Sequence, residues 1–435
     1  MYKRQVDNAF HYRDLRLIAQ IATVLGNTTD ATDFTNRANL VQSAFNNVFW
    51  NTASSRYQDG ETSTHISAHA NFFPLAMGLV PPNLPSVLSF LKTARANPSS
   101  GLVGNMPCSV YGAQYLLEAL FQSGEEDYAI SLMASNSSSY NRTWWNMLSV
   151  GSTLTMEAWD ISYKGNLTWN HAWGSAPANI VPRYVLGVKP LTAGFGQAEI
   201  KPQLGTGSTT AGLTSASGIV PTIRGPVSVN VIENTATTFK MRVTIPGNMT
   251  AQVSIPAKGY TSGAVLLDGQ TVAATLTGGR FVLPSVGSGM HAIYLSSTTA
   301  PSANVLKDNW KTAMFGDAAS NSAIAGDSAD PDGDGQTNVQ EFYANTDPLN
   351  ATDYFATSAT QYVPANGGTS ATFKMTVPGK AGRQYVLQRS PTLTPTATWT
   401  SVASSAVLSA DGSVMLTDTA PPPSAAFYRT RVQLP

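Results

Sequence analysis

Cysteine and charge are scarce in this sequence. Cys108 is the one cysteine among 435 residues, so no disulfide can form within the chain, and we expect this residue to be buried. Charged residues make up 12% of the chain, about half of the usual share. The 26 Lys and Arg balance the 26 Asp and Glu, so neither nucleic acid nor an anionic membrane is an expected partner.

Long hydrophobic runs are also missing. No run reaches the length of a membrane span, and the polar residues 1–8 lack the apolar region of a secretory signal. Because a helical pattern begins by residue 12, we expect the chain to start inside a domain whose upstream part is missing. A neutral surface rich in Ser, Thr, Asn and Gly is typical of extracellular proteins that handle uncharged polymers. We therefore expect a bacterial protein that is secreted, periplasmic or attached to the cell surface.

Hydrophobic spacing predicts helices over the first part of the chain, residues 1–190. The first predicted helix repeats apolar residues at helical spacing, namely Leu15, Leu17, Ile18, Ile21, Ala22 and Leu25. Six or seven helices follow one another, separated by short polar loops. Helical hairpins packed in layers are typical of an α/α barrel, of which this part would be the C-terminal half.

The period of the pattern changes near residue 191. Apolar residues alternate with polar ones between Val227 and Ile255, as expected for a β-sandwich over residues 191–297. Residues 298–353 form a polar linker, and residues 354–435 return to strands in a small immunoglobulin-like sandwich. The predicted fold class is therefore multidomain α plus β, with a partial (α/α)6 barrel followed by two β-sandwich domains.

Tryptophan is concentrated in one segment. Five of the eight tryptophans lie within thirty residues: Trp144, Trp145, Trp159, Trp169 and Trp173. The C–H faces of a sugar ring stack on indole, while the sugar hydroxyls need directional polar partners. The cluster therefore indicates a sugar-binding pocket, with core packing between helices as the alternative.

Glu157 is the candidate catalytic carboxylate of this segment. Its neighbours Met156, Ala158 and Trp159 are apolar, and such surroundings can raise the pKa of a carboxyl group or hold it for proton transfer. A loop carboxylate bonded to the backbone is the alternative. Asp160 could support Glu157, bind a sugar hydroxyl or have a structural role.

His171 follows Glu157 by fourteen residues. A neutral imidazole can donate a hydrogen bond to a sugar hydroxyl or orient a water molecule. We expect the pocket to include His171 and its neighbour Asn170, together with the tryptophans. A lone histidine is more often structural, but this one lies among five tryptophans.

Three motifs in this region resemble the α-L-rhamnosidases of glycoside hydrolase family 78. They are T-M-E-A-W-D at 155–160, N-H-A-W-G-S-A-P at 170–177 and P-R-Y-V-L-G-V-K-P-L at 182–191. A-E-I-K-P-Q-L-G at 198–205 resembles the start of that family's sandwich domain. The resemblance covers about residues 9–297 and implies an inverting glycosidase with an α/α barrel.

The resemblance also implies roles for individual residues. An inverting glycosidase uses one carboxyl group as general acid and a second as the base that activates water. Glu157 matches the family's general base, and His171 matches a histidine that contacts the sugar. The family's general acid lies in an upstream loop that no segment of this chain matches, so we expect the chain alone to lack it.

The predicted function is therefore release of terminal α-L-rhamnose from a glycan or glycoside, with carbohydrate as the partner. Two alternatives remain open. One is a non-catalytic fragment that only binds carbohydrate. The other is an inverting α/α-barrel glycosidase for a different sugar, because fold alone does not choose the substrate.

His65 and His69 are spaced to lie on one face of a predicted helix at 65–79. Such a pair can bind a metal, but the acidic partner of a zinc-protease motif is missing. We expect His69 to line the sugar pocket, with plain helix packing as the alternative.

Residues 330–341, with the sequence D-P-D-G-D-G-Q-T-N-V-Q-E, fit the twelve-residue calcium loop. The predicted ligands are Asp330, Asp332, Asp334, the backbone carbonyl of Gln336, Asn338 and Glu341. Gly335 permits the sharp turn at position six. We expect a structural Ca²⁺ and no cofactor for catalysis; an acidic linker without metal is the alternative.

Overall fold

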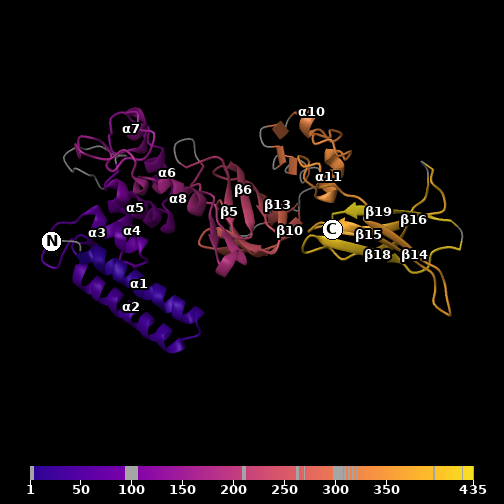
Figure 1. Cartoon of the computed structure of the whole chain (residues 1–435), viewed down its shortest axis with the longest axis horizontal. Coiled ribbons are helices and arrows are strands. Elements are labelled where there is room, and N and C mark those ends of the chain that lie inside the picture. Colours follow the sequence, from indigo (N-terminus) through magenta and orange to yellow (C-terminus); the bar gives the residue numbers. More distant parts are fainter. Residues whose placement is uncertain are drawn as a thin grey trace. The chain divides into compact units, whose positions relative to one another are not determined.

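The structure is a computed structural model. It describes residues 4–93, 106–207, 212–260, 264–268, 270–296, 321–394, 397–423 and 425–434, together with residues 307, 310–311, 314–315 and 318–319. The first residues of the predicted linker, 298–306, lie outside the described residues. The chain forms two compact units (Figure 1). The helical unit comprises Met1–Val185 and Gln203–Leu213, and the β unit comprises Leu186–Pro202 and Thr214–Pro435.

Helices build most of the helical unit. They are α1 (Arg4–Val24), α2 (Thr28–Phe49), α3 (Ala68–Ala76), α4 (Leu84–Thr93), α5 (Val110–Gln122), α6 (Glu126–Ala134), α7 (Trp144–Ser149) and α8 (Ala176–Ile180), with a short hairpin of β1 (Trp50–Asn51) and β2 (Arg56–Tyr57) after α2. Gly26, at φ +74°, ends the first helix, and the Asn27 side chain caps α2 by accepting a hydrogen bond from the Asp30 N–H at 3.1 Å. Among the described helices, none is long and apolar enough to cross a bilayer.

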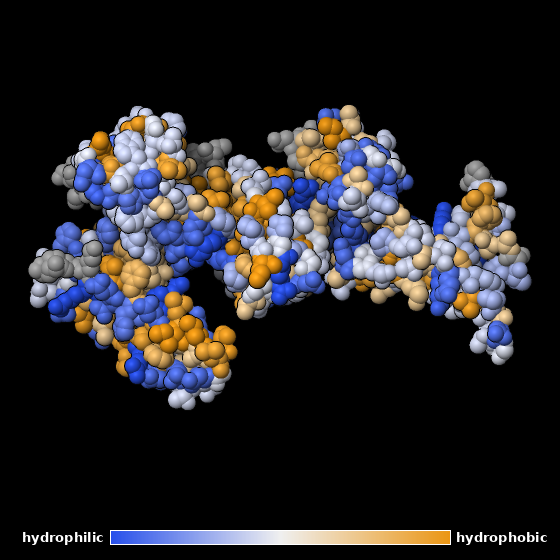
Figure 2. All heavy atoms as spheres, viewed as in Figure 1, coloured by the Kyte–Doolittle hydropathy of each residue, from blue (hydrophilic) through white to orange (hydrophobic). Residues whose placement is uncertain are grey.

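The predicted first helix is confirmed, but most of the apolar residues that predicted it lie outside its buried face. The buried face of α1 is Gln5, Ala9, Tyr12, Leu15, Ala19 and Ala22. Leu17, Ile18, Ile21 and Leu25 are instead 40–76% exposed. Figure 2 shows apolar residues gathered over the α1–α2 hairpin. The helix is therefore apolar on more than one face, and only one of these faces is covered by its own unit.

The core of the helical unit centres on α5. This helix packs against α3, α6 and α8, and buries Leu116, Leu117 and Leu120 completely. Residues 150–171, by contrast, contain no regular helix or strand, and a 3-10 turn, Ala172–Gly174, follows. This irregular segment is the one that carries Glu157 and His171.

Two sheets form the sandwich of the β unit. The six-stranded sheet has the order β10 (Gln270–Val272), β9 (Ala264–Leu267), β13 (Gly289–Ser296), β7 (Phe239–Ile245), β6 (Gly225–Asn234), β5 (Ala216–Thr222). The five-stranded sheet has the order β11 (Thr275–Thr277), β12 (Arg280–Val286), β8 (Thr250–Pro256), β4 (Gln197–Ile200), β3 (Val188–Pro190). Val227, Val229 and Val231 are all completely buried. The alternation predicted for these strands is confirmed, because period-two side chains share one face of a sheet.

A smaller module ends the chain. Its two sheets have the orders β14 (Ala359–Val363), β15 (Thr372–Gly379), β18 (Gly412–Asp418) and β17 (Thr400–Ser404), β16 (Gln384–Ser390), β19 (Phe427–Gln433). Its core includes Val377, Tyr385 and Leu387, which are completely buried. The predicted second region of strands is thus present. Before it lie two short helices, α10 (Ser322–Ala325) and α11 (Asn338–Ala344).

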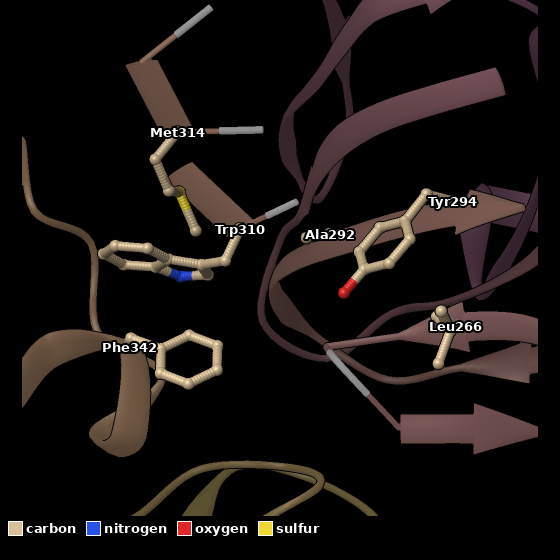
Figure 3. Close-up of a cluster of buried hydrophobic side chains, with 6 residues drawn as sticks. All are labelled: Leu266, Ala292, Tyr294, Trp310, Met314 and Phe342. Carbon is tan, nitrogen blue, oxygen red and sulfur yellow. The ribbon is translucent and has the colours of Figure 1, made fainter. Parts of the chain in front are cut away.

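Helix α11 belongs to a core shared with the sandwich. Trp310, Met314 and Phe342 pack in one buried cluster with Leu266, Ala292 and Tyr294 (Figure 3). The first three side chains come from the linker. The last three come from strands β9 and β13. The linker is therefore packed onto the sandwich by a hydrophobic cluster to which both contribute side chains.

Candidate active site

Backbone hydrogen bonds hold the irregular segment around Glu157. The Glu157 N–H donates to the Thr168 carbonyl at 3.0 Å, and the His171 N–H donates to the Thr155 carbonyl at 2.7 Å. The Thr168 N–H in turn donates to Glu157 Oε2 at 3.1 Å. These bonds bring residues 155–157 beside residues 168–171. Glu157 and His171, predicted as one site, are thereby placed close together in the folded chain.

The negative charge of the Glu157 carboxylate is balanced by nearby hydrogen-bond donors. Lys164 Nζ forms an ion pair with Glu157 Oε1. The hydrogen bond from Lys164, the hydrogen bond from the Thr168 N–H and the positive charge of Lys164 hold the pKa of Glu157 below its usual value. The sequence indicated surroundings that could raise this pKa, and the direction is the opposite. An ionised carboxylate is the form that a general base requires.

His171 is fixed by its neighbours. Thr168 Oγ1 contacts Nδ1 of its ring, and Thr155 Oγ1 donates to its carbonyl at 2.5 Å. The ring also packs on Trp173, with 4.3 Å between the two ring centroids. With Asn170 and Thr155, His171 lines a cavity of about 550 Å³ whose other walls are mainly apolar. Glu157 is not among the residues that line this cavity.

The tryptophans of the cluster differ in exposure. Trp145, Trp169 and Trp173 are 41–46% exposed, so part of each indole faces solvent. Trp159 is only 2% exposed, packs edge-on against Trp144, and donates from its indole N–H to the Cys108 carbonyl at 2.7 Å. A sugar-contacting Trp159 does not fit this burial: the residue belongs to the core. Cys108 is itself buried, as expected, and burial raises the pKa of its thiol.

Asp160 bonds to its own segment. It accepts hydrogen bonds from Asn146 Nδ2 and from the Ser162 N–H, both at 2.9 Å. The same Asn146 amide donates to the Trp159 carbonyl at 2.9 Å. Of the three roles that the sequence left open for Asp160, the structural one fits these contacts.

His69 lines a second cavity of about 550 Å³ in the helical unit. Its ring stacks on Phe73 at a centroid distance of 6.2 Å. Tyr111 lines the same cavity and packs edge-on against Trp173 at 5.9 Å. Because Trp173 also contacts His171, a row of ring contacts joins the two predicted histidines. It runs from His171 through Trp173, Tyr111, Tyr115 and Phe73 to His69.

Sequence reasoning missed several residues of this site. Lys164, Thr168 and Tyr111 carry no motif of their own, and each reaches the site through loop pairing or through helix packing. A lysine seven residues from Glu157 in an irregular segment gives no periodic signal. These three could have been found only from the folded chain.

The predicted calcium loop lies in the β unit. Oxygens of Asp330, Asp332 and Asp334 come within 4.8 Å of one another. Gly335 has φ +91°, as the sharp turn at position six requires. Asn338 and Glu341 follow in α11, and both are completely buried. The donor set consists of oxygens, which are the ligands that Ca²⁺ prefers.

Comparison with known families identifies the chain. The bacterial α-L-rhamnosidase six-hairpin glycosidase domain matches residues 2–185, and the bacterial α-L-rhamnosidase C-terminal domain matches residues 187–265. Residues 2–185 and 187–265 thus match two successive domains of one family, the bacterial α-L-rhamnosidases. The resemblance predicted from the motifs around Glu157 is thus confirmed, and so is the fold class of a helical glycosidase domain followed by β domains.

Individual relatives agree with this assignment. An α-L-rhamnosidase of Alteromonas sp. is 26% identical over 265 residues, covering 58% of this chain and 26% of the relative. One of Streptomyces avermitilis is 28% identical over 270 residues, covering 59% and 23%. The chain therefore spans about a quarter of the length of these relatives.

Solved structures support the fold. The α-L-rhamnosidase of Dictyoglumus thermophilum matches 66% of this chain and 31% of its own, with TM-score 0.56 and 21% identity. The S. avermitilis enzyme, solved with L-rhamnose, matches 66% and 26%, with TM-score 0.52 and 24% identity. At these identities the likeness establishes the fold alone, and the site has to be argued from the residues of this chain.

Proposed function

We propose that this chain supplies the general base and part of the sugar pocket of an inverting α-L-rhamnosidase. The single observation that carries the proposal is the environment of Glu157, which holds its carboxylate ionised. In the proposed reaction Glu157 takes a proton from water while the water oxygen bonds to the anomeric carbon. The glycosidic C–O bond breaks, and the leaving oxygen is protonated by a general acid. The sugar emerges with inverted configuration.

The surrounding side chains fit the binding of a sugar. We propose that the half-exposed Trp145, Trp169 and Trp173 offer faces for the C–H groups of the ring. His171 and Asn170 offer polar groups for its hydroxyls, and His69 and Tyr111 line a second cavity. Burial excludes Trp159 from this proposal.

The test is release of p-nitrophenol from its α-L-rhamnoside by the chain and by Glu157→Gln. The substitution keeps the size of the side chain and removes the base, so we expect a loss of about 10²- to 10⁴-fold in kcat. The first-formed rhamnose should be the β-anomer, which NMR spectroscopy of the fresh product detects. Equal rates for the two proteins would contradict the role of Glu157.

Glu199→Gln is the matched control. Glu199 lies on β4 in the other unit and also forms an ion pair with a lysine, Lys189, at 3.8 Å. We expect the control to keep full activity. A chain that releases no p-nitrophenol but binds L-rhamnose in NMR titrations would support the second candidate, a carbohydrate-binding protein, which the exposed indoles of Trp145, Trp169 and Trp173 favour.

We also propose that the protein is bacterial and works outside the cytoplasm. The support is its low charge, its single buried cysteine and its polar uncharged surface. Fractionation of the native host followed by detection with an antibody tests this placement. Detection in the cytoplasmic fraction alone would contradict it.

A further inference from the structure

The β unit holds a group of acidic side chains that the glycosidase reaction does not use. Asp332 Oδ2, Asp334 Oδ2 and Glu341 Oε2 are buried, and no described group donates a hydrogen bond to any of them. Glu341 is completely buried as a residue. Buried carboxylates without partners are strongly unfavourable, so such oxygens imply a cation that the polypeptide does not provide.

The two carboxylate oxygens of Glu341 differ in their surroundings. Glu341 Oε2 is buried and no described group donates a hydrogen bond to it. Its other oxygen, Oε1, accepts a hydrogen bond from Thr346 Oγ1 at 3.4 Å. One oxygen is therefore held by the protein, while the other has no described donor.

We propose that residues 330–341 bind one Ca²⁺ through these oxygens, and that the ion fixes helix α11 at the joint between the sandwich and the C-terminal module. Asp330, Asp332, Asp334 and Glu341 supply the carboxylates, and Gln336 supplies its carbonyl. Asn338 Oδ1 is also buried and without a described donor, so it is a further candidate ligand. Ca²⁺ accepts six to eight oxygens in flexible geometry, which suits this mixed set better than octahedral Mg²⁺ does.

The joint is held by contacts that begin at the loop. Asn338 Nδ2 donates to the Ile324 and Gly326 carbonyls, both at 2.8 Å, and ties the loop to α10. Gln336 Nε2 donates to the Phe355 carbonyl at 2.6 Å, at the start of the C-terminal module. An ion that fixes the loop therefore also fixes the α10 region and the start of the C-terminal module, because both are hydrogen-bonded to the loop.

Arg383 completes the joint at the other end of α11. This completely buried residue of the C-terminal module donates to the Phe342, Tyr343 and Asp268 carbonyls, each at 2.8 Å. Phe342 of the same helix packs in the cluster with Trp310 and Tyr294 (Figure 3). Displacement of α11 would break both the apolar cluster and the bonds of Arg383.

The experiment measures Ca²⁺ directly on the full chain. Isothermal titration of the EDTA-treated protein with CaCl₂ should give one ion per chain. Thermal unfolding should shift upward by about 5–10 °C when free Ca²⁺ exceeds its Kd a hundredfold. MgCl₂ at the same concentration should give a smaller shift. Limited proteolysis should cleave between 321 and 355 faster in EDTA than in Ca²⁺.

Two variants and a control keep the result interpretable. Asp334→Ala should abolish the heat of binding and the thermal shift. Glu341→Gln should weaken both. Because Glu341→Gln removes a buried charge, this variant should also tolerate the metal-free state. Asp14→Asn removes one exposed carboxylate in the helical unit and should change neither. Absence of binding by the unaltered chain, equal shifts with Mg²⁺, or binding that both loop variants retain would overturn the proposal.

Discussion

Glu157 and Glu341 show two ways in which one protein can hold a carboxylate. Glu157 lies near the surface, and its oxygens meet the Lys164 ammonium and the Thr168 N–H. Glu341 is completely buried, and one of its oxygens meets only the like charges of Asp332 and Asp334. The pKa of the first is lowered and the pKa of the second is raised.

The difference indicates what each carboxylate is for. A carboxylate whose counter-charge is part of the chain has a lowered pKa and is ionised at neutral pH, which is the form that a general base requires. A carboxylate whose counter-charge is missing from the chain depends on an ion from the surroundings, which suits a structural site. The same side chain thus has two uses, and its neighbours decide between them.

The largest expected effect is on stability: Glu341→Gln should change the free energy of unfolding in opposite directions without and with Ca²⁺. Without Ca²⁺ and at a pH above the Glu341 pKa of about 8, Glu341→Gln should raise the free energy of unfolding by about 1–3 kcal/mol, because a neutral amide replaces a buried carboxylate whose Oε2 has no described donor. With saturating Ca²⁺ the same variant should be less stable than the unaltered protein. Urea unfolding in EDTA and in CaCl₂ measures both. Destabilisation in both buffers would show that Glu341 has its counter-charge within the chain.

The next effect concerns Lys164. Lys164→Met removes the ion pair, so the pKa of Glu157 should rise toward its usual value. The carboxylate is ionised above its pKa, and the acid limb of any activity profile should therefore move to higher pH. Carboxyl ¹³C NMR titration of Glu157 measures this without relying on turnover. Lys189→Met, which breaks the comparable pair with Glu199, should leave the Glu157 titration unchanged.

The smallest effect is the response to salt. Raising NaCl to 0.5 M should shift the pKa of Glu157 upward by less than Lys164→Met does, because an exposed ion pair is only partly screened and the Thr168 N–H remains. The same NMR titration at two salt concentrations provides the comparison. A shift as large as that of Lys164→Met would mean that the lysine acts through its long-range charge alone.

The sequence predicted the regular parts of this protein well. Val227, Val229 and Val231 alternate as sandwich strands should, and Gly335 takes the positive φ expected from the calcium-loop pattern. Both signals are local, because a strand's period and a turn's glycine follow from neighbouring residues. The family was likewise predictable, since the motifs at 155–160 and 170–177 are short and contiguous.

The site was less predictable because it depends on contacts between segments. Trp159 and Trp169 are alike in sequence, yet one is buried against Trp144 and the other is half-exposed. The direction of the Glu157 pKa depends on Lys164, which pairing of the irregular segment places beside it. On α1, the choice of buried face depends on which partner helices are present, and hydrophobic spacing alone does not contain that information.

Arg383 has a consequence for how such proteins are assembled in evolution. Its guanidinium donates hydrogen bonds to three backbone carbonyls. These carbonyls belong to segments more than seventy residues apart, at Asp268 and at Phe342–Tyr343. Recombination that exchanged the last module alone would place this cation against unfamiliar carbonyls or none. Evolution should therefore favour inheritance of three segments as one unit: the sandwich, the acidic loop and the last module. Lineages that exchange domains should keep or lose these three segments together.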